Sequence, residues 1–394
     1  MAKVKAAAGP LLTLAAGALV TVRFASLGDY PQDAGPPMRA LLEGHLGRAI
    51  ELQPLMGGFA LLARLPFAAL ALIGSGSELL VYRLGALPCV AAAALLGLAC
   101  WRLTEGRSPA ARLCFAALCI LNPPIAAALG AGHPEEILGG ALAVAAVLLA
   151  IRGRTLLGAL ALGLALATKQ WALLAVLPFL LAVPGRRGRA LLVSGSTALL
   201  LTLPFLVGDL GRFSQMTGMA AATPRGSGRE TIWWLITSPR HGYATSWVLP
   251  GWVGHVAHPL ILLVAVPLSF LFLRRGGARE DALGLLALVF LLRCILDPVD
   301  NAYYHVPFLL ALVAWEALRR ETPLASALAA AGLWLVFSRV APHHGAALAN
   351  ASYLVVALCL AAYLVSALFG PGAPAASRLR PGPASPSRPA RRPA

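Results

Sequence analysis

Two carboxylates follow the first apolar stretch of this chain. They are Asp29 and Asp33, in the segment GDYPQD, where Gly28 and Pro31 favour a turn. A carboxylate held at such a turn could act as a general base. The other interpretation is a solvated loop acid, or a cap for a helix that starts near Pro36.

A histidine and two glutamates open another apolar stretch, in the segment GHPEE from Gly132 to Glu136. His133, Glu135 and Glu136 could bind a polar substrate or a divalent metal. Acidic residues are also favoured in the first turn of any helix by the helix dipole. Three ligands are too few to predict a metal site, and both interpretations remain open.

Two isolated cations also lie beside apolar runs. Lys169 lies between two of them, in ATKQW, and Arg293 lies one turn inside another. A cation at such a place needs a carboxylate or an anionic ligand such as a lipid phosphate. Lys169 could instead extend to a membrane interface beside Trp171. We favour the phosphate-binding interpretation for Lys169.

The densest polar turn is DPVDNAYYH, from Asp297 to His305. Asp297, Asn301, Tyr304 and His305 could orient a hydroxyl-rich substrate through hydrogen bonds. Helix capping and an interfacial tyrosine belt would explain the same residues.

A later segment combines arginine with tryptophan. Arg225 and Arg229 precede Trp233 and Trp234. Guanidinium groups bind phosphate through paired hydrogen bonds, and indole rings stack on sugars. An interfacial helix would have the same composition.

The elements that must position these residues follow from composition. Of 394 residues, 59% are apolar and 12% charged, and the mean hydropathy is +0.77. Soluble domains are roughly 45–50% apolar and about 25% charged. The composition therefore excludes a soluble enzyme, a coiled coil and a disordered chain. It predicts an all-α, polytopic integral membrane protein.

We interpret the net charge of +16 as evidence on the orientation of the chain in the membrane and not as evidence of a nucleic-acid partner. The arginines form short clusters between apolar stretches, as on the cytoplasmic ends of membrane spans, and no single basic face for nucleic acid is indicated. The six cysteines lie in apolar stretches without CxxC or Cys/His spacing, so we interpret them as packing residues.

About twelve spans are predicted, since a span needs about 20 apolar residues. Their approximate ranges are 6–24, 78–101, 109–129, 135–151, 155–168, 171–184, 190–208, 255–273, 282–297, 303–318, 323–340 and 347–369.

Residues 37–74 are predicted to form interfacial or re-entrant helices, because a crossing there would place the cluster Arg102–Arg112 outside. The multi-spanning domain then covers 1–370, with outer loops at 25–56 and 209–250. Residues 371–394 form a disordered basic tail. Both termini are predicted to be cytoplasmic and the polar face extracytoplasmic.

No phosphate-binding glycine loop, GxSxG or HExxH motif occurs in the sequence. A cytosolic nucleotide is therefore not the expected group donor. We expect no cofactor, with a divalent metal left open.

The motifs together resemble those of membrane glycosyltransferases of the GT-C fold, most closely the branch assigned to glycosyltransferase family 87. The resemblance covers most of residues 1–345. It is carried by Asp29 after the first span, QPL (53–55), YRL (82–84), NPP (122–124), GHPEE (132–136), GLALATKQWALL (163–174) and LDPVDNAYYHVPF (296–308).

The resemblance implies inverting transfer of a mannose-like hexose from a polyprenyl phosphate to a glycan or lipid acceptor at the outer membrane face. Asp29 would be the general base, with Asp33 as the alternative, because the first loop lacks the family's DxD or DE pair. Four cations would stabilise the departing phosphate: Lys169, Arg225, Arg229 and Arg293. The remaining candidates would position donor or acceptor: His133, Glu135, Glu136, Asp297, Asn301, Tyr304 and His305.

A transporter or flippase for a lipid-linked or anionic substrate is the main alternative. It would place charged groups at the bilayer midplane and show related halves or broken helices in matching positions. We find no repeat of the first six spans in the last six, and most ionisable groups lie at span ends. A non-catalytic scaffold would not need so many polar groups on one face.

Overall fold

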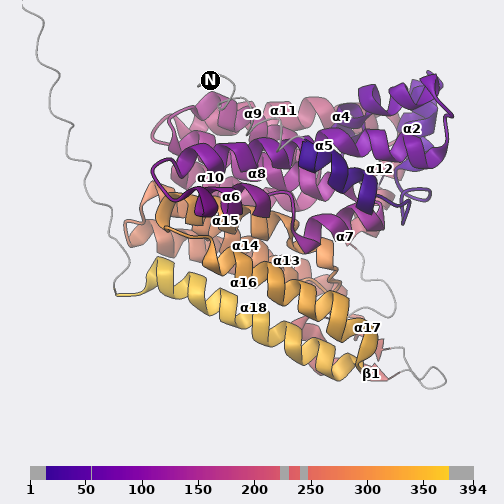
Figure 1. The fold of residues 1–394 in the computed structure, drawn as a ribbon. Coiled ribbons are helices and arrows are strands. Elements are labelled where there is room, and N and C mark those ends of the chain that lie inside the picture. Colours follow the sequence, from indigo (N-terminus) through magenta and orange to yellow (C-terminus); the bar gives the residue numbers. More distant parts are fainter. Residues whose placement is uncertain (1–14, 55, 222–229, 240–246, 372–394) are drawn as a thin grey trace, which may run out of the picture.

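The computed structural model describes residues 15–54, 56–221, 230–239 and 247–371. In these residues the chain is helical apart from two antiparallel strands of two residues each, β1 (Ser238–Pro239) and β2 (Trp247–Val248). The helices lie roughly parallel or antiparallel to one another in stacked layers (Figure 1).

Seven helical segments are long and apolar enough to cross a membrane. This length and composition fit a multi-pass membrane protein. The segments are α5 (Glu78–Leu103), α6 (Pro109–Leu118) with α7 (Pro123–Ala131), α8 (Pro134–Ile151), α11 (Arg187–Gly208), α13 (Val253–Arg274), α16 (Leu324–Trp334) with η6 (Leu335–Val340) and α17 (Ala341–His343), and α18 (Ala346–Phe369).

The other predicted spans also coincide with helices, but these are shorter. They are the helix Ala15–Phe24, α9 (Thr155–Leu166), η2 (Gln170–Ala175) with α10 (Val176–Ala182), α14 (Ala282–Leu296), and η5 (Ala302–His305) with α15 (Val306–Arg319). The prediction of an all-helical, membrane-type chain is confirmed, while twelve spans are not. Residues 6–14 of the first predicted span and the tail from 372 lie outside the described residues.

Burial explains why short helices had the composition of spans. Nearly every residue of α14 and α15 is buried by neighbouring helices. A helix enclosed by protein is apolar all round, just as a helix enclosed by lipid is. Apolar composition alone does not distinguish the two cases.

The predicted span 109–129 is broken by Asn122. Its side-chain oxygen accepts a hydrogen bond from the Ile125 backbone N–H (2.9 Å), and its amide nitrogen donates to the Leu118 carbonyl (2.8 Å). Pro123 starts α7, where its missing N–H is not needed. The segment therefore consists of two helices, α6 and α7.

The segment predicted to be interfacial consists of four short helices. They are α2 (Gly35–Leu42), α3 (Leu46–Leu52), α4 (Gly58–Ala69) and η1 (Leu70–Ile73). The predicted loop 209–250 also contains helices, α12 (Leu210–Ala221) and η3 (Ile232–Ile236). The Asp209 side chain caps α12 by accepting a hydrogen bond from the Arg212 N–H at 2.8 Å, so residues 210–221 are helical where a loop was predicted.

The arginine-rich turns gather at one end of the bundle, and the predicted site residues lie near the other. The short elements α2, α7, α12 and α17 lie at one end (Figure 1). Consecutive long helices alternate in direction, so the turns 104–108, 152–154, 183–186, 275–278 and 320–323 fall at the other. There Arg107 pairs with Glu321 at 3.8 Å, and η4 (Arg279–Asp281) is tied to α15 by Asp281 and Arg319.

Candidate functional site

The loop that carries Asp29 is bound to the end of α7 through backbone contacts. The N–H of Asp29 donates to the Ala131 carbonyl at 2.8 Å. Gly28 has a φ of +48°, and a Cβ there would lie 2.2 Å from the Ala131 backbone. Gly132 ends α7 with a φ of +91°. Two glycines thus permit an approach that places Asp29 beside His133.

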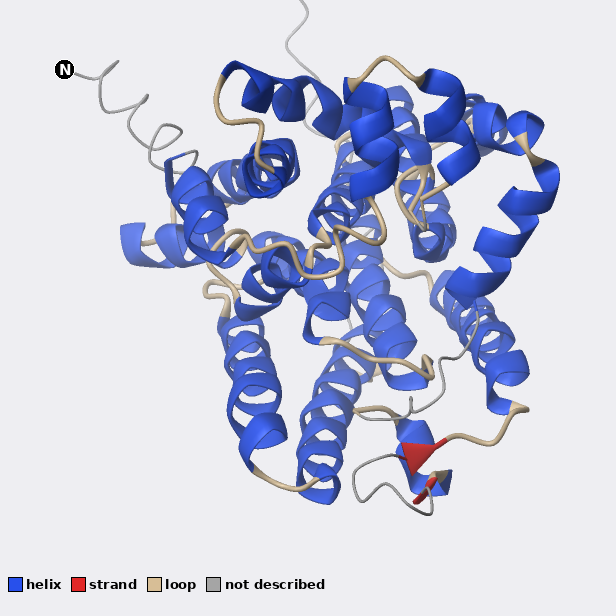
Figure 2. Cartoon of the chain, turned by 90° about the vertical axis from the view of Figure 1, so that its right-hand side faces the viewer, coloured by secondary structure: helices blue, strands red, loops and turns tan. Residues whose placement is uncertain are grey.

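From Asp29, a chain of polar contacts leads into the protein. The Asp29 carboxylate, 68% exposed, lies 3.2 Å from His133 Nε2. His133 Nδ1 lies 2.9 Å from Oε1 of Glu135, which has no exposed side-chain surface. Lys169 Nζ is 3.2 Å from both Glu135 Oε1 and Glu136 Oε1. An accessible carboxylate is therefore linked to a buried charged network. Figure 2 shows the molecule from the end that carries α2, α7 and α12.

Lys169 lies at a break between two apolar helices. Thr168 donates its hydroxyl hydrogen to the Leu164 carbonyl (2.7 Å) at the end of α9, and the Lys169 backbone is extended before η2 begins. The N–H of Gly57 donates to the Thr168 carbonyl at 2.9 Å, so α4 starts against this break. The partner that Lys169 requires is supplied by two carboxylates.

Arg64 belongs to this network, although it was not among the predicted site residues. Its side chain is fully buried in α4, with Nη1 3.7 Å from Glu135 Oε2. The guanidinium lies 5.3 Å from the ring centroid of Tyr30 and 5.8 Å from that of Tyr82. Its nitrogens make no hydrogen bond in the described part of the chain. The available signal was a single arginine in an otherwise apolar segment.

Aromatic side chains from η5 form one side of the site. The Tyr303 ring stacks on His133 at 4.8 Å between centroids. Arg293 of α14 lies 4.7 Å from the ring centroid of Tyr304 and 5.3 Å from that of Trp171. Within the described residues no carboxylate lies within 4.0 Å of Arg293. Arg293 is therefore contacted by aromatic rings and not by a close carboxylate.

The environment shifts the pKa of two groups beside Asp29. Burial disfavours the charged form of His133, but its hydrogen bond to Glu135 and that residue's charge outweigh burial and raise the His133 pKa. Burial raises the pKa of the half-buried Asp33, partly offset by the charges of His133 and Lys169. No side chain caps α2, so the helix-cap interpretation of the first loop is not found.

The other predicted site residues that the structure describes do not contact Asp29, and they lie in the turn from Asp297 to His305. Asp297 accepts a hydrogen bond from the Val299 N–H and lies 3.7 Å from His258. The Asn301 amide is 3.4 Å from the Tyr303 hydroxyl. His305 is fully buried, and the structure does not bring it to Asp29. Arg225 and Arg229 lie outside the described residues.

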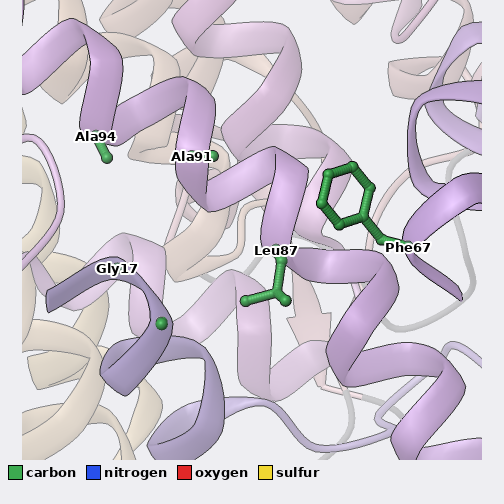
Figure 3. Close-up of a pocket in the computed structure, with 6 residues that line it drawn as sticks. Gly17, Phe67, Leu87, Ala91 and Ala94 are labelled. Atoms are coloured by element: carbon green, nitrogen blue, oxygen red, sulfur yellow. The ribbon is translucent and has the colours of Figure 1, made fainter. Parts of the chain in front are cut away.

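Two further features were not predicted. One group in the described part of the chain has a geometry suited to a metal ion, namely Cys294, Asp300 and His305. An apolar pocket also opens between the first helix, α4 and α5 (Figure 3). Its lining includes no ionisable side chain. The pocket residues are Gly17, Ala18, Phe67, Leu87, Ala91 and Ala94.

The chain was also compared with known proteins, once for similarity to whole families and once for similarity to individual curated proteins. No protein-family model matches the chain, and no curated protein shows significant similarity to it.

Proposed function

We propose that the protein is a membrane glycosyltransferase of the GT-C type, resembling glycosyltransferase family 87. It transfers a mannose-like hexose from a polyprenyl phosphate to a glycan or lipid acceptor at the extracytoplasmic face. The observation that carries the proposal is the exposed Asp29 carboxylate held by His133 at one end of a bundle of apolar helices.

The reaction requires a base and a stabilised leaving group. Asp29 removes the proton from an acceptor hydroxyl while the acceptor oxygen forms a bond to the anomeric carbon. The bond from that carbon to the phosphate oxygen breaks, and the polyprenyl phosphate leaves with one more negative charge. Because the acceptor attacks opposite the leaving group, the configuration inverts.

His133 supports Asp29 in this role. Its contact with Glu135 fixes the imidazole, whose other nitrogen faces the Asp29 carboxylate. A base of fixed direction is more effective than a freely rotating loop acid. Glu135 and Glu136 therefore contribute by holding His133 and Lys169 in place.

Arg293 is the cation best suited to the departing phosphate. It is held by aromatic rings rather than by a carboxylate, so its hydrogen-bond donors can bind oxygen. Lys169 already contacts two carboxylates and serves mainly to neutralise them. Tyr303 and Tyr304 provide aromatic surface that suits a sugar ring.

The proposal includes the membrane arrangement. In this arrangement the short apolar helices also cross the membrane, packed against their neighbours inside the bundle, which gives about twelve crossings. The helices from α2 to η1 lie in the membrane interface. The arginine-rich end faces the cytoplasm, as the positive-inside rule requires. The end with Asp29 then faces the lipid-linked donor on the outer leaflet.

A transporter or flippase is the second candidate, and one observation favours it. Arg64 and Glu135 form a fully buried ion pair, and the helices break at Lys169 nearby. Buried charges beside broken helices are typical of transport pathways. Such a protein would move its substrate without changing it.

The test is reconstitution of the purified full-length chain into liposomes with radiolabelled polyprenyl-phosphate mannose and a mixture of envelope glycan and lipid acceptors. A transferase yields a labelled acceptor together with free polyprenyl phosphate. A flippase yields intact donor that becomes accessible on the other leaflet, with no labelled acceptor. The second result would replace the first proposal with the second.

A further inference from the structure

A second polar cluster lies in the same polypeptide turn as the candidate site but is formed by different side chains. Cys294 lies near the end of α14, Asp300 lies in the turn, and His305 ends η5. One potential ligand atom from each lies within 4.8 Å of the others. We propose that these three residues bind a zinc ion.

The burial of Asp300 is the strongest independent observation. Its side chain has no exposed surface, and neither carboxylate oxygen receives a well-formed hydrogen bond. The phenol of Tyr353 interacts with it, and His305 Nε2 lies 3.5 Å away. Within the described residues no lysine or arginine nitrogen lies within 4.0 Å of this carboxylate. A buried carboxylate without a cation is costly, and a bound metal ion would remove that cost.

His305 is the second buried ligand candidate, and its side chain has no exposed surface. Its Nδ1 makes no hydrogen bond within the described residues. His305 Nε2 faces both Asp300 and the hydroxyl of Tyr353, which lies 3.1 Å away.

The donor set selects the metal. A thiolate, an imidazole and one carboxylate are ligands for zinc, whereas calcium and magnesium prefer oxygen donors alone. Zinc is held at about 2.3 Å by sulfur and about 2.0–2.2 Å by nitrogen and oxygen, so tetrahedral ligand atoms lie about 3.3–3.6 Å apart. Atoms that lie within 4.8 Å of one another must therefore approach by up to about 1 Å when the ion binds.

The charges also balance. The ion carries two positive charges, and the Cys294 thiolate and the Asp300 carboxylate carry one negative charge each. Binding releases the thiol proton to solvent. The resulting neutral site is suited to the interior of an apolar bundle. The Tyr353 hydroxyl of α18, 3.1 Å from His305 Nε2, is available beside the three ligands as a fourth oxygen.

Such an ion would be structural. It would join the end of α14 to the start of α15 across the turn 297–305. Tyr303 and Tyr304 precede the ligand His305 directly, so the metal would fix the aromatic side of the candidate site without contacting substrate.

The experiment measures metal directly and does not require transferase activity. The full-length chain is purified in detergent with a tag that contains no histidine, then dialysed against metal-free buffer. Mass spectrometry should find about one zinc ion per chain. After removal of zinc by a chelator, cobalt(II) should bind and give the intense absorption of a thiolate–cobalt bond.

Variants assign the site. Cys294→Ala should lose both the zinc and the thiolate–cobalt absorption, while Cys119→Ala, another fully buried cysteine, should retain both. Asp300→Asn provides a second variant of nearly the same shape in case Cys294→Ala does not fold, and it should also bind less metal. A folded wild-type chain that binds neither zinc nor cobalt would overturn the proposal. Equal metal content in the wild type and Cys294→Ala would overturn it too.

Discussion

At the scale of single residues, the central feature is the sequence of contacts from Asp29 through His133 to Glu135. One contact joins residues two positions apart, and the other joins residues 104 positions apart. An exposed acid is thereby coupled to groups without solvent contact. The coupling has consequences for pH and for stability.

His133 should make stability depend on pH. Its contact with Glu135 outweighs burial and raises the His133 pKa. A histidine with a raised pKa in the folded state stabilises the fold fully below its ordinary pKa of about 6.5, and this stabilisation is lost as pH rises through the folded pKa. The thermal midpoint of the wild type should therefore fall from about pH 6.5 upward relative to that of His133→Gln.

The control for this comparison is His344→Gln, which removes an exposed histidine. Its thermal midpoint should follow the wild type across the same pH range. If His133→Gln instead shows the same pH dependence as the wild type, His133 does not titrate in the way described.

The buried pair of Arg64 and Glu135 should be sensitive to removal of one partner. Glu135→Gln leaves Arg64 buried without a carboxylate, which costs about 3–5 kcal/mol. Adding Arg64→Met should recover part of that loss, because no charge then remains unpaired at this position. The free energy of unfolding in mixed micelles measures both effects.

An exposed pair provides the comparison. Arg48 and Glu51 lie 3.1 Å apart with both side chains more than half exposed. Glu51→Gln should cost less than about 1 kcal/mol. Equal losses for Glu135→Gln and Glu51→Gln would mean that burial adds nothing to the first pair.

At the scale of elements, the contact between the first loop and α7 positions the proposed base. Gly28→Ala places a Cβ 2.2 Å from backbone atoms of Ala131 and also requires a left-handed conformation. The conformation alone costs about 1–2 kcal/mol. The clash should add to this and move Asp29, so both the thermal midpoint and the transfer rate should fall.

Gly44→Ala separates the two causes. Gly44 has a φ of +78° with nothing within 4 Å of the added Cβ. Gly44→Ala should therefore lower the free energy of unfolding only by the cost of the left-handed conformation, and its transfer rate should equal that of the wild type. Equal effects of the two substitutions on stability and transfer would show that the contact with α7 is unimportant.

Much of the site could be predicted at this scale. Polar segments at the ends of apolar stretches are expected to meet at one end of an alternating bundle, and Asp29, His133 and Lys169 do meet. The position of Arg64 could not be predicted, because its partner depends on which face of α4 packs inward. The cluster at Cys294 depends on the path of a nine-residue turn, which local patterns do not define.

At the scale of the whole molecule, the sequence predicted an all-helical chain with about twelve spans, and seven of these coincide with helices long and apolar enough to cross a membrane. The buried helices α14 and α15 are apolar because protein surrounds them. Hydropathy reports an apolar environment without identifying it. The arginine-rich turns fall at one end of the bundle because consecutive long helices alternate in direction. Which end faces the cytoplasm stays a prediction.

This arrangement predicts the sidedness of two exposed residues. Glu43→Cys and Arg187→Cys are introduced singly after the exposed Cys114 and Cys359 have been changed to alanine. A membrane-impermeant maleimide should label the first in intact cells and the second after permeabilisation. Labelling of both from the same side would contradict the proposed arrangement.

The most direct test of the proposed function is the transfer rate of Asp29→Asn in the reconstituted system. Asparagine keeps the size of the side chain but cannot accept the proton from the acceptor. The rate should fall by about 10²–10⁴-fold at saturating donor, whereas Asp33→Asn should remain within about tenfold of the wild type, less than the loss of a general base. Full transfer by Asp29→Asn would contradict the account.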